Sequence, residues 1–344
     1  MQIEKNKPVA IWLFISAAAV FLMALIGAVT RLTESGLSIV VWEPISGTLP
    51  PLNAQAWEET FALYKQSPQY TLINAGMSLS EFKEIFFWEW LHRLWGRLIG
   101  LVYAVPLAYF WVKGKIPAPA KKPLLGILAL GFLQGAMGWF MVMSGLVDEP
   151  TVSHYRLAAH LLLAFAIFCA TFYMGLVFSV KKPEASPHYA PLRHVLWTTL
   201  GLAVITMAWG AFTAGLRAGH LYADTFPMMG RDLWPAEIFY LRPHWVNFVE
   251  NHAAVQFAHR VLAIMTLVMV FLVVRAKFPP ARISRTVKTL MFALLLAICA
   301  QATLGAATVI SHVDIVIATL HQAGAMTILA LFAAIFYHLP VTKE

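Results

Sequence analysis

The chain has 344 residues, of which 60% are hydrophobic and 12% are charged, and its mean hydropathy is +0.70. Soluble domains carry about twice that share of charged residues, so the composition excludes a water-soluble globular protein and indicates an integral membrane protein. The formal net charge of +8 does not indicate a nucleic-acid partner, because the basic residues form short patches between apolar segments, as topology signals do.

Eight apolar segments are long enough to cross a bilayer, which takes about 20 helical residues. In chain order they cover about 9–30, 85–112, 123–144, 157–180, 193–215, 253–274, 288–310 and 315–338. The predicted fold class is therefore an all-α integral membrane protein with eight transmembrane helices. Cys169 and Cys299 lie inside apolar segments of different halves, so no disulfide is expected.

Basic residues gather before the first segment and in the connections after the second, fourth and sixth segments. They are Lys5, Lys7, Lys113, Lys115, Lys121, Lys122, Lys181, Lys182, Arg193, Arg275, Lys277, Arg282, Arg285 and Lys288. The positive-inside rule then predicts that both termini are cytoplasmic. The N-terminus runs into the first segment without a transit peptide or a cleavage site, which favours a multi-pass protein of the bacterial inner (plasma) membrane. The long connections at 37–84 and 216–250 are expected on the outer side, with short amphipathic helices at the surface.

The second half of the chain repeats residues of the first half. At a spacing of 167 residues, His92, Arg93, Gln134 and Gly138 recur as His259, Arg260, Gln301 and Gly305. Gly27 in the first segment is matched by Gly210 in the fifth. Each half holds four segments, an even number, so the halves are expected to be parallel repeats. The predicted organisation is two four-helix bundles, 1–182 and 183–344.

Each half adds one more histidine inside an apolar segment, His160 in the first and His321 in the second. All four segment histidines fall near the outer ends of even-numbered segments, so each half is expected to place two imidazoles at similar depth. Two histidines that face each other across a bundle can ligate a heme iron from both sides. The alternative is that each histidine hydrogen-bonds a neighbouring helix. A zinc site is disfavoured, because no carboxylate or thiol completes a ligand set beside either pair.

Glu89 stands three residues before His92, and Gln256 stands at the matching place before His259. A carboxylate on the same helix face as an iron ligand indicates an acid, a base or an orienting group for chemistry at the macrocycle edge. The alternative for Glu89 is an ion pair with Arg93.

Further polar residues accompany the histidines. Arg93, Arg97 and Arg260 are candidates to pair with heme propionates, and the alternative is that they reach towards the interface. Gln134 and Gln301 are expected to hydrogen-bond between helices.

Several motifs together resemble the heme A synthase family. They are the segment Glu89-Trp90-Leu91-His92-Arg93, the stretch MSLSEFKEIFFWEW that leads into it, Gly47-Thr48-Leu49-Pro50-Pro51, the repeated Gln-x-x-x-Gly and the four segment histidines. The resemblance covers essentially the whole chain. It implies an oxidoreductase that converts the C8 methyl group of heme O to the formyl group of heme A, for cytochrome oxidase biogenesis. The outward connections lack a cysteine pair, so the chain resembles the cysteine-free branch, with mitochondrial members and bacterial relatives.

The resemblance also implies roles for the residues. His92 and His160 would flank the iron of the substrate heme O with Glu89 beside them, and His259 and His321 would ligate a resident heme b that moves electrons. The residue pattern agrees, because electron transfer needs only two ligands and a dry pocket, whereas methyl oxidation benefits from a titratable group.

The implied partners are heme O, heme O synthase, an unidentified electron acceptor and membrane lipid, with no nucleic acid and with homo-oligomer formation left open. The alternative function is a bis-histidine electron-transfer membrane cytochrome b. It would hold two equivalent permanent hemes and would not require Glu89.

Overall fold

A computed structural model describes residues 5–42, 46–146, 150–181, 183–276 and 283–340. Within these ranges the chain is helical, and the only pairing of the β type is an isolated bridge between Met229 and Asp232. Eight helices of the described chain are long and apolar enough to cross a membrane. This finding confirms the predicted all-α class with eight transmembrane helices.

The long helices correspond to the predicted segments one by one. They are α1 (Lys7–Leu32), α4 (Leu79–Val112), α5 (Ala118–Met143), α6 (His154–Ser179), α7 (Ala190–Gly215), α9 (His252–Arg275), α10 (Arg285–Ile310) and α11 (Ile315–Tyr337). The largest difference is at α4, which begins six residues before the predicted segment. Ser78 and Glu81 form a capping box there, which satisfies the first free N–H groups. Hydropathy misses these turns because they carry charged residues.

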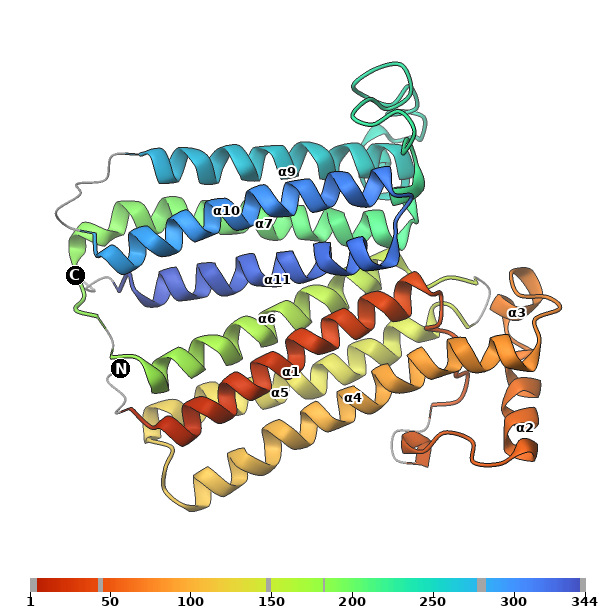
Figure 1. The fold of residues 1–344 in the computed structure, drawn as a ribbon, viewed down its shortest axis with the longest axis horizontal. Helices are drawn as coiled ribbons and strands as arrows, with labels where there is room; N and C mark the ends of the chain where they lie inside the picture. The colour runs from red at the N-terminus through yellow and green to blue at the C-terminus, as the bar shows by residue number, and fades with distance from the viewer. Residues whose placement is uncertain (1–4, 43–45, 147–149, 182, 277–282, 341–344) are drawn as a thin grey trace.

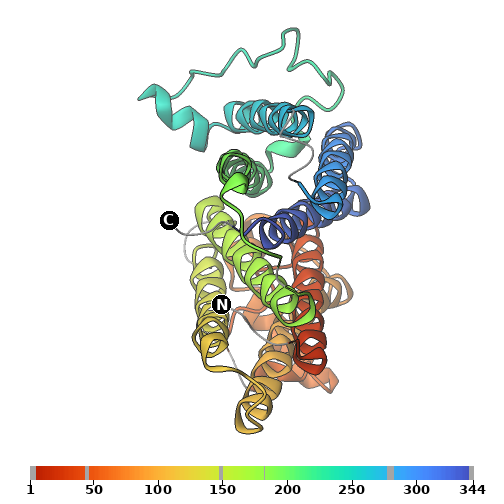
Figure 2. The ribbon, with the colours of Figure 1, turned by 90° about the vertical axis from the view of Figure 1, so that its left-hand side faces the viewer.

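The helices form two groups, which lie one above the other in Figure 1. In the first group α1 packs against α4 and α6, and α5 packs against α6. In the second group α7 packs against α9, and α10 packs against α9 and α11. The groups meet where α6 contacts α7 and α11, and where α1 contacts α11. Figure 2 shows that the two groups together make an elongated bundle.

Both chain ends lie at the same end of this bundle (Figure 1). The Asn6 side chain donates to the Lys115 carbonyl at 3.3 Å, and the Tyr337 hydroxyl donates to the Val180 carbonyl at 2.6 Å. The termini therefore meet the connections that follow α4 and α6, which are among the basic ones. Lys182, Lys277 and Arg282 lie outside the described residues. The cytoplasmic location of this end stays a prediction.

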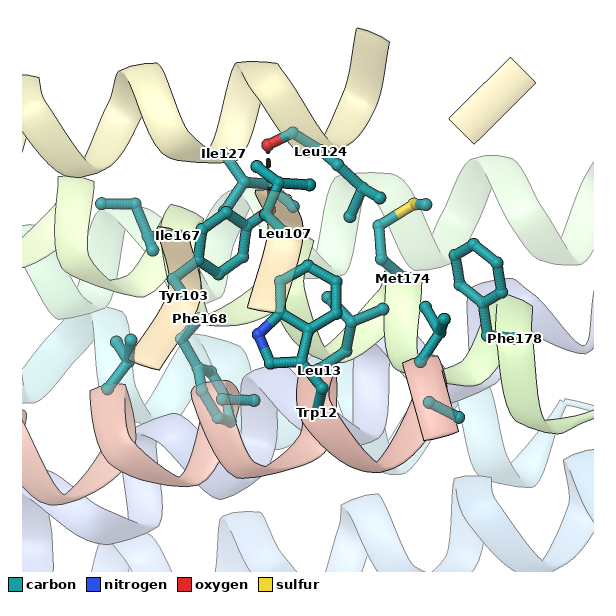
Figure 3. Packing of buried hydrophobic residues seen from close by; sticks show 14 of the residues in the cluster. Trp12, Leu13, Tyr103, Leu107, Leu124, Ile127, Ile167, Phe168, Met174 and Phe178 are labelled. Atoms are coloured by element: carbon teal, nitrogen blue, oxygen red, sulfur yellow. Dashed lines mark hydrogen bonds between the residues drawn. The ribbon is translucent and has the colours of Figure 1, made fainter. Parts of the chain in front are cut away.

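One hydrophobic core fills the first group of helices (Figure 3). Trp12 of α1, Tyr103 of α4 and Phe168 of α6 are all buried in it. The buried polar atoms are satisfied, since the Trp12 indole N–H donates to the Val102 carbonyl at 2.9 Å and the Tyr103 hydroxyl to the Leu124 carbonyl at 2.9 Å.

The same core continues into the second half of the chain. It includes Ala325, Met326 and Leu329 of α11, whereas a second core lies among α7, α9, α10 and α11. The first core therefore crosses the boundary that the sequence predicts at 182/183, where residue 182 itself lies outside the described residues. The division into two bundles stays a prediction.

The two long connections lie at the end opposite the termini (Figure 1). The first holds a single turn, η1 (Ser46–Thr48), and two short helices, α2 (Ala54–Tyr64) and α3 (Pro68–Leu72), as predicted. The second holds only short turns: η3 (Ala218–His220), η4 (His244–Val246) and α8 (Asn247–Glu250).

Candidate functional site

The four segment histidines lie on α4, α6, α9 and α11, and each ring faces a glycine of a neighbouring helix. Gly27 of α1 faces His92, Gly138 of α5 faces His160, Gly210 of α7 faces His259, and Gly305 of α10 faces His321. A Cβ atom added to these glycines would lie 3.2, 3.1, 3.0 and 3.0 Å from the nearest ring atom, in that order. The same kind of contact thus occurs twice in each half.

Each group of helices carries two of the histidines. His92 lies on α4 and His160 on α6, whereas His259 lies on α9 and His321 on α11. All four residues are only partly covered by the protein, although they lie inside long apolar helices. That the two imidazoles of each half face each other stays a prediction.

The depth of the histidines is less uniform than predicted when it is counted from the helix starts. His160, His259 and His321 follow the first residues of their helices by only six or seven positions, or about 10 Å. His92 follows Leu79 by 13 positions, or about 20 Å, because the outer turns of α4 extend beside α2 and α3 (Figure 1).

Hydrogen bonds fix three of the four histidines. The Nδ1 atom of His259 lies 3.0 Å from the Thr206 carbonyl oxygen, which can only accept, so Nδ1 carries the proton and Nε2 keeps its lone pair. The Gln134 amide nitrogen donates to the His160 carbonyl at 3.1 Å and lies 3.2 Å from both ring nitrogens. The Gln301 amide donates to the His321 carbonyl at 2.9 Å. The predicted bonding of both glutamines between helices is thus observed.

Several buried polar atoms beside the histidines have no hydrogen-bond partner within the described chain. They are Gln134 Oε1, Gln301 Oε1, His321 Nδ1 and Arg260 Nε. A buried polar atom without a partner costs about 1–3 kcal/mol, so such atoms beside the histidines of each half indicate sites for a polar or metal-bearing group. Paired imidazoles with such atoms beside them fit a heme, whose iron takes two axial nitrogens.

Glu89 is 3% exposed and is bonded on both carboxylate oxygens. Oε1 accepts from Arg93 Nε at 3.1 Å and Nη2 at 2.7 Å. Oε2 accepts from the Ser38 hydroxyl at 2.7 Å and from the Ile39 N–H at 2.8 Å. Arg93 in turn donates to the Ile39 carbonyl at 2.9 Å. The ion pair with Arg93, the alternative for Glu89, is therefore present and holds the chain after α1 onto α4.

Gln256 and Arg260 form the matching arrangement in the second half. There the Gln256 side chain donates hydrogen bonds to the connection, whereas Glu89 accepts them. The Gln256 amide nitrogen donates to the carbonyls of Ala218 at 2.8 Å and Leu221 at 3.0 Å, and its oxygen accepts from Arg260 at 3.1 Å. Arg260 also donates to the Pro227 carbonyl at 3.1 Å. The sequence analysis does not predict that Arg93 and Arg260 bind the two long connections, because nothing in the motifs marks the backbone atoms that they contact.

No group of three or more His, Cys, Asp or Glu residues that could hold a metal ion occurs in the described ranges. The two cysteines are free thiols, with Cys169 half-buried and Cys299 exposed.

Eight helices that can cross a membrane, four of which each carry one of the segment histidines, define a class, the multi-pass membrane proteins with histidines inside their membrane helices. The family model described as cytochrome oxidase assembly protein matches residues 10–333, and the chain belongs to this family. Two relatives, each named heme A synthase, come from Rhodospirillum centenum and Nitrosospira multiformis. They are 47% identical to this chain over 94% and 93% of its length, covering 86% and 90% of their own. A third, from Agrobacterium fabrum, is also named heme A synthase and is 43% identical over 97% of the chain and 90% of its own length. The protein is a multi-pass protein of the bacterial inner membrane.

Proposed function

We propose that this protein is a heme A synthase that oxidises the C8 methyl group of heme O to the formyl group of heme A. His92 and His160 hold the iron of the substrate heme, and His259 and His321 hold a resident heme b. The observation that carries the proposal is the close contact of four helix-borne histidines, two in each half, with glycines of neighbouring helices. The relatives named heme A synthase support it over nearly the full chain.

Conversion of a methyl group to a formyl group adds one oxygen atom and removes four electrons. The protein must therefore hold the substrate near a route by which electrons leave. When bound by His259 and His321, heme b supplies one-electron transfer. The Thr206 carbonyl keeps the proton of His259 on Nδ1, which leaves Nε2 free to ligate iron.

Glu89 has an orienting role in this proposal. Four donor contacts already reach its two oxygens, so the carboxylate has little capacity left to move a proton to or from the substrate. It fixes Ser38 and Ile39 to α4 one turn outward from His92. The first connection is thereby held beside the outer end of the substrate site, where it limits the access of water.

Arg260 is the better candidate to bind a propionate. Its Nε atom is buried and has no partner within the described chain, whereas Nη1 and Nη2 bind Pro227 and Gln256. Arg93 has both Nε and Nη2 on Glu89 and has a further contact to the Ile39 carbonyl. The other proposed partners, heme O synthase and an electron acceptor, follow from the need to receive a membrane-soluble substrate and to release electrons.

The test is the heme content and the spectrum of purified histidine variants. Replacing His259 or His321 with alanine should abolish the low-spin heme b signal, because an iron that loses one strong axial ligand changes its spin state. Replacing His92 or His160 should leave heme b in place and abolish heme A formation.

Survival of the low-spin signal in both second-half variants would contradict the assignment. Two permanent heme b groups in the parent protein, with neither heme O nor heme A extracted, would instead support the electron-transfer cytochrome.

A further inference from the structure

We infer that Gly27, Gly138, Gly210 and Gly305 are positioning residues for the four histidines. Each glycine leaves a side-chain-free patch of helix against which one imidazole ring lies, and so sets the place and the plane of that ring. The inference rests on the proposed function, in which these rings ligate heme iron.

The contacts leave no room for a methyl group unless the imidazole ring moves. An ordinary Cβ contact lies at 3.4–4 Å, and at 3.0–3.2 Å the neighbour must move by a few tenths of an ångström. At Gly138, Gly210 and Gly305 the nearest ring atom is Cε1, which lies between the two ring nitrogens. At Gly27 it is His92 Nε2 itself, at 3.2 Å. An added methyl group would thus press on the edge of the ring that a metal approaches.

Several other glycines of the same helices have no close contact. A Cβ added to Gly131 or Gly135 of α5, or to Gly201 of α7, would meet no atom within 4 Å. Gly135 precedes Gly138 by less than one turn, and Gly201 lies on the same helix as Gly210. The close approach to a ring therefore belongs to particular positions and is not a general property of glycine in these helices.

At three of the four histidines, a polar group one turn before the glycine also makes a hydrogen bond to the histidine. Gln134 precedes Gly138 by four residues and Gln301 precedes Gly305 by four, so each pair shares one helix face. Each glutamine binds the backbone of the histidine whose ring meets the glycine.

Thr206 precedes Gly210 by four residues in the same way, and its carbonyl accepts from the His259 ring. In α1 the corresponding residue before Gly27 is Met23, and the His92 ring makes no hydrogen bond within the described chain. Three histidines are thus held at two points of one helix face, through the backbone or the ring as well as through the glycine contact, and His92 is held at one.

The experiment compares glycine-to-alanine variants of the full-length, heme-loaded protein. Gly210→Ala and Gly305→Ala are the test variants, and Gly201→Ala is the matched control on α7. The readouts are the heme b content, the midpoint potential and the electron paramagnetic resonance g-values of low-spin heme b, which depend on the ligand planes. Loss of a contact that orients a metal ligand typically weakens metal binding by about 10–100-fold. We expect shifted g-values and at least about tenfold weaker heme retention in both test variants, with the control unchanged.

Gly138→Ala, against Gly135→Ala as its control, gives the same comparison for the substrate site, with bound heme O as the readout. The inference is overturned if the test variants match their controls in g-values and heme retention. If Gly210→Ala fails to fold and Gly305→Ala folds, the Gly305→Ala protein decides the test, because Gly305 lies on a different helix. Retention of low-spin heme b in the His259→Ala and His321→Ala proteins would instead overturn the proposed function.

Discussion

Glu89 and Gln256 occupy matching positions, and the connections that they contact differ in hydrogen-bonding character. The chain after α1 presents donors to Glu89, the Ser38 hydroxyl and the Ile39 N–H. The chain after α7 presents acceptors to Gln256, two backbone carbonyls. A carboxylate can only accept, whereas an amide can donate. This complementarity explains why the first half has a glutamate where the second half has a glutamine. The explanation does not require Glu89 to take part in proton transfer.

Glu89→Gln should therefore weaken the first connection as well as turnover. An amide can satisfy either the Arg93 guanidinium or the Ser38 and Ile39 donors, but not both. One buried group left without a partner costs about 1–3 kcal/mol. We expect heme O to accumulate while heme b stays, together with faster proteolysis within residues 37–78. Heme A output at the parental level, with unchanged proteolysis, would contradict this role.

The reciprocal change, Gln256→Glu, is the control for that experiment. It places carboxylate oxygens against the carbonyls of Ala218 and Leu221, which repel them. We expect faster proteolysis within residues 216–250 and no change within 37–78, measured by mass spectrometry of the fragments. Equal cleavage of both connections in either variant would show that the effect is not local.

Helix α4 is longer than its hydropathy predicts because its outer turns pack against α2 and not against lipid. Phe82 and Phe86 of α4 are buried with Phe61 and Tyr64 of α2 in a small aromatic cluster. The rings of Phe82 and Phe61 stack with their centroids 4.9 Å apart. This cluster attaches the first connection to the bundle independently of Glu89.

Phe82→Ala should detach α2 from α4 without disturbing the eight long helices. Replacing a fully buried phenylalanine with alanine lowers stability by about 3–5 kcal/mol. Phe82 is fully buried outside the two main cores, so only the contact between α2 and α4 should be weakened. The expected result is rapid cleavage between α2 and α4 with a circular dichroism spectrum close to that of the parent protein. Phe87→Ala is the matched control, since Phe87 lies on the same helix and is 46% exposed. Cleavage of both variants at the same rate would refute the role of the cluster.

Much at the scale of elements could be predicted from the sequence. The eight helices follow from apolar segment length alone, since a backbone in lipid must bond internally. The start of α4 could not be predicted in this way, because it depends on a capping box and on contacts with α2. The histidine pairs follow from the repeat, but the glycine that faces each ring follows only from how neighbouring helices pack. The role of Glu89 was ambiguous because the Ser38 and Ile39 donors are 50 residues away in the chain.

At the scale of the whole molecule, residues at matching positions of the two halves touch one another. Arg31 of α1 donates to the Ala214 carbonyl of α7 at 2.7 Å, and Arg217 pairs with Glu34 at 3.0 Å. Arg31 matches Ala214, and Glu34 matches Arg217, at the 183-residue spacing that relates Gly27 to Gly210. Contacts between equivalent positions are expected close to an axis that relates two parallel repeats. They support the predicted duplication.

Arg31→Met should lower the thermal stability of the joined halves. It leaves the Gly215 carbonyl, at the end of α7, without the guanidinium donor at 3.3 Å, and one such loss costs about 1–3 kcal/mol. Arg217→Met is the control, because its ion pair is more than one-third exposed and such pairs contribute only about 0–1 kcal/mol. Melting of both proteins in detergent measures the difference. A larger loss in Arg217→Met would contradict the argument.

The continuation of the first core into α11 has a consequence for how the protein is made. Helix α1 is synthesised before α11, yet part of its packing surface is supplied by Met326 and Leu329 of α11. At about 5–20 residues per second, roughly 15–60 s of synthesis separate the two. During that time α4 and α6 can already pack against α1, but the part of α1 that α11 later covers faces lipid or an insertion factor. Chains released before α11 would keep this part of α1 open, so we expect membrane proteases to degrade them faster than chains that contain α11.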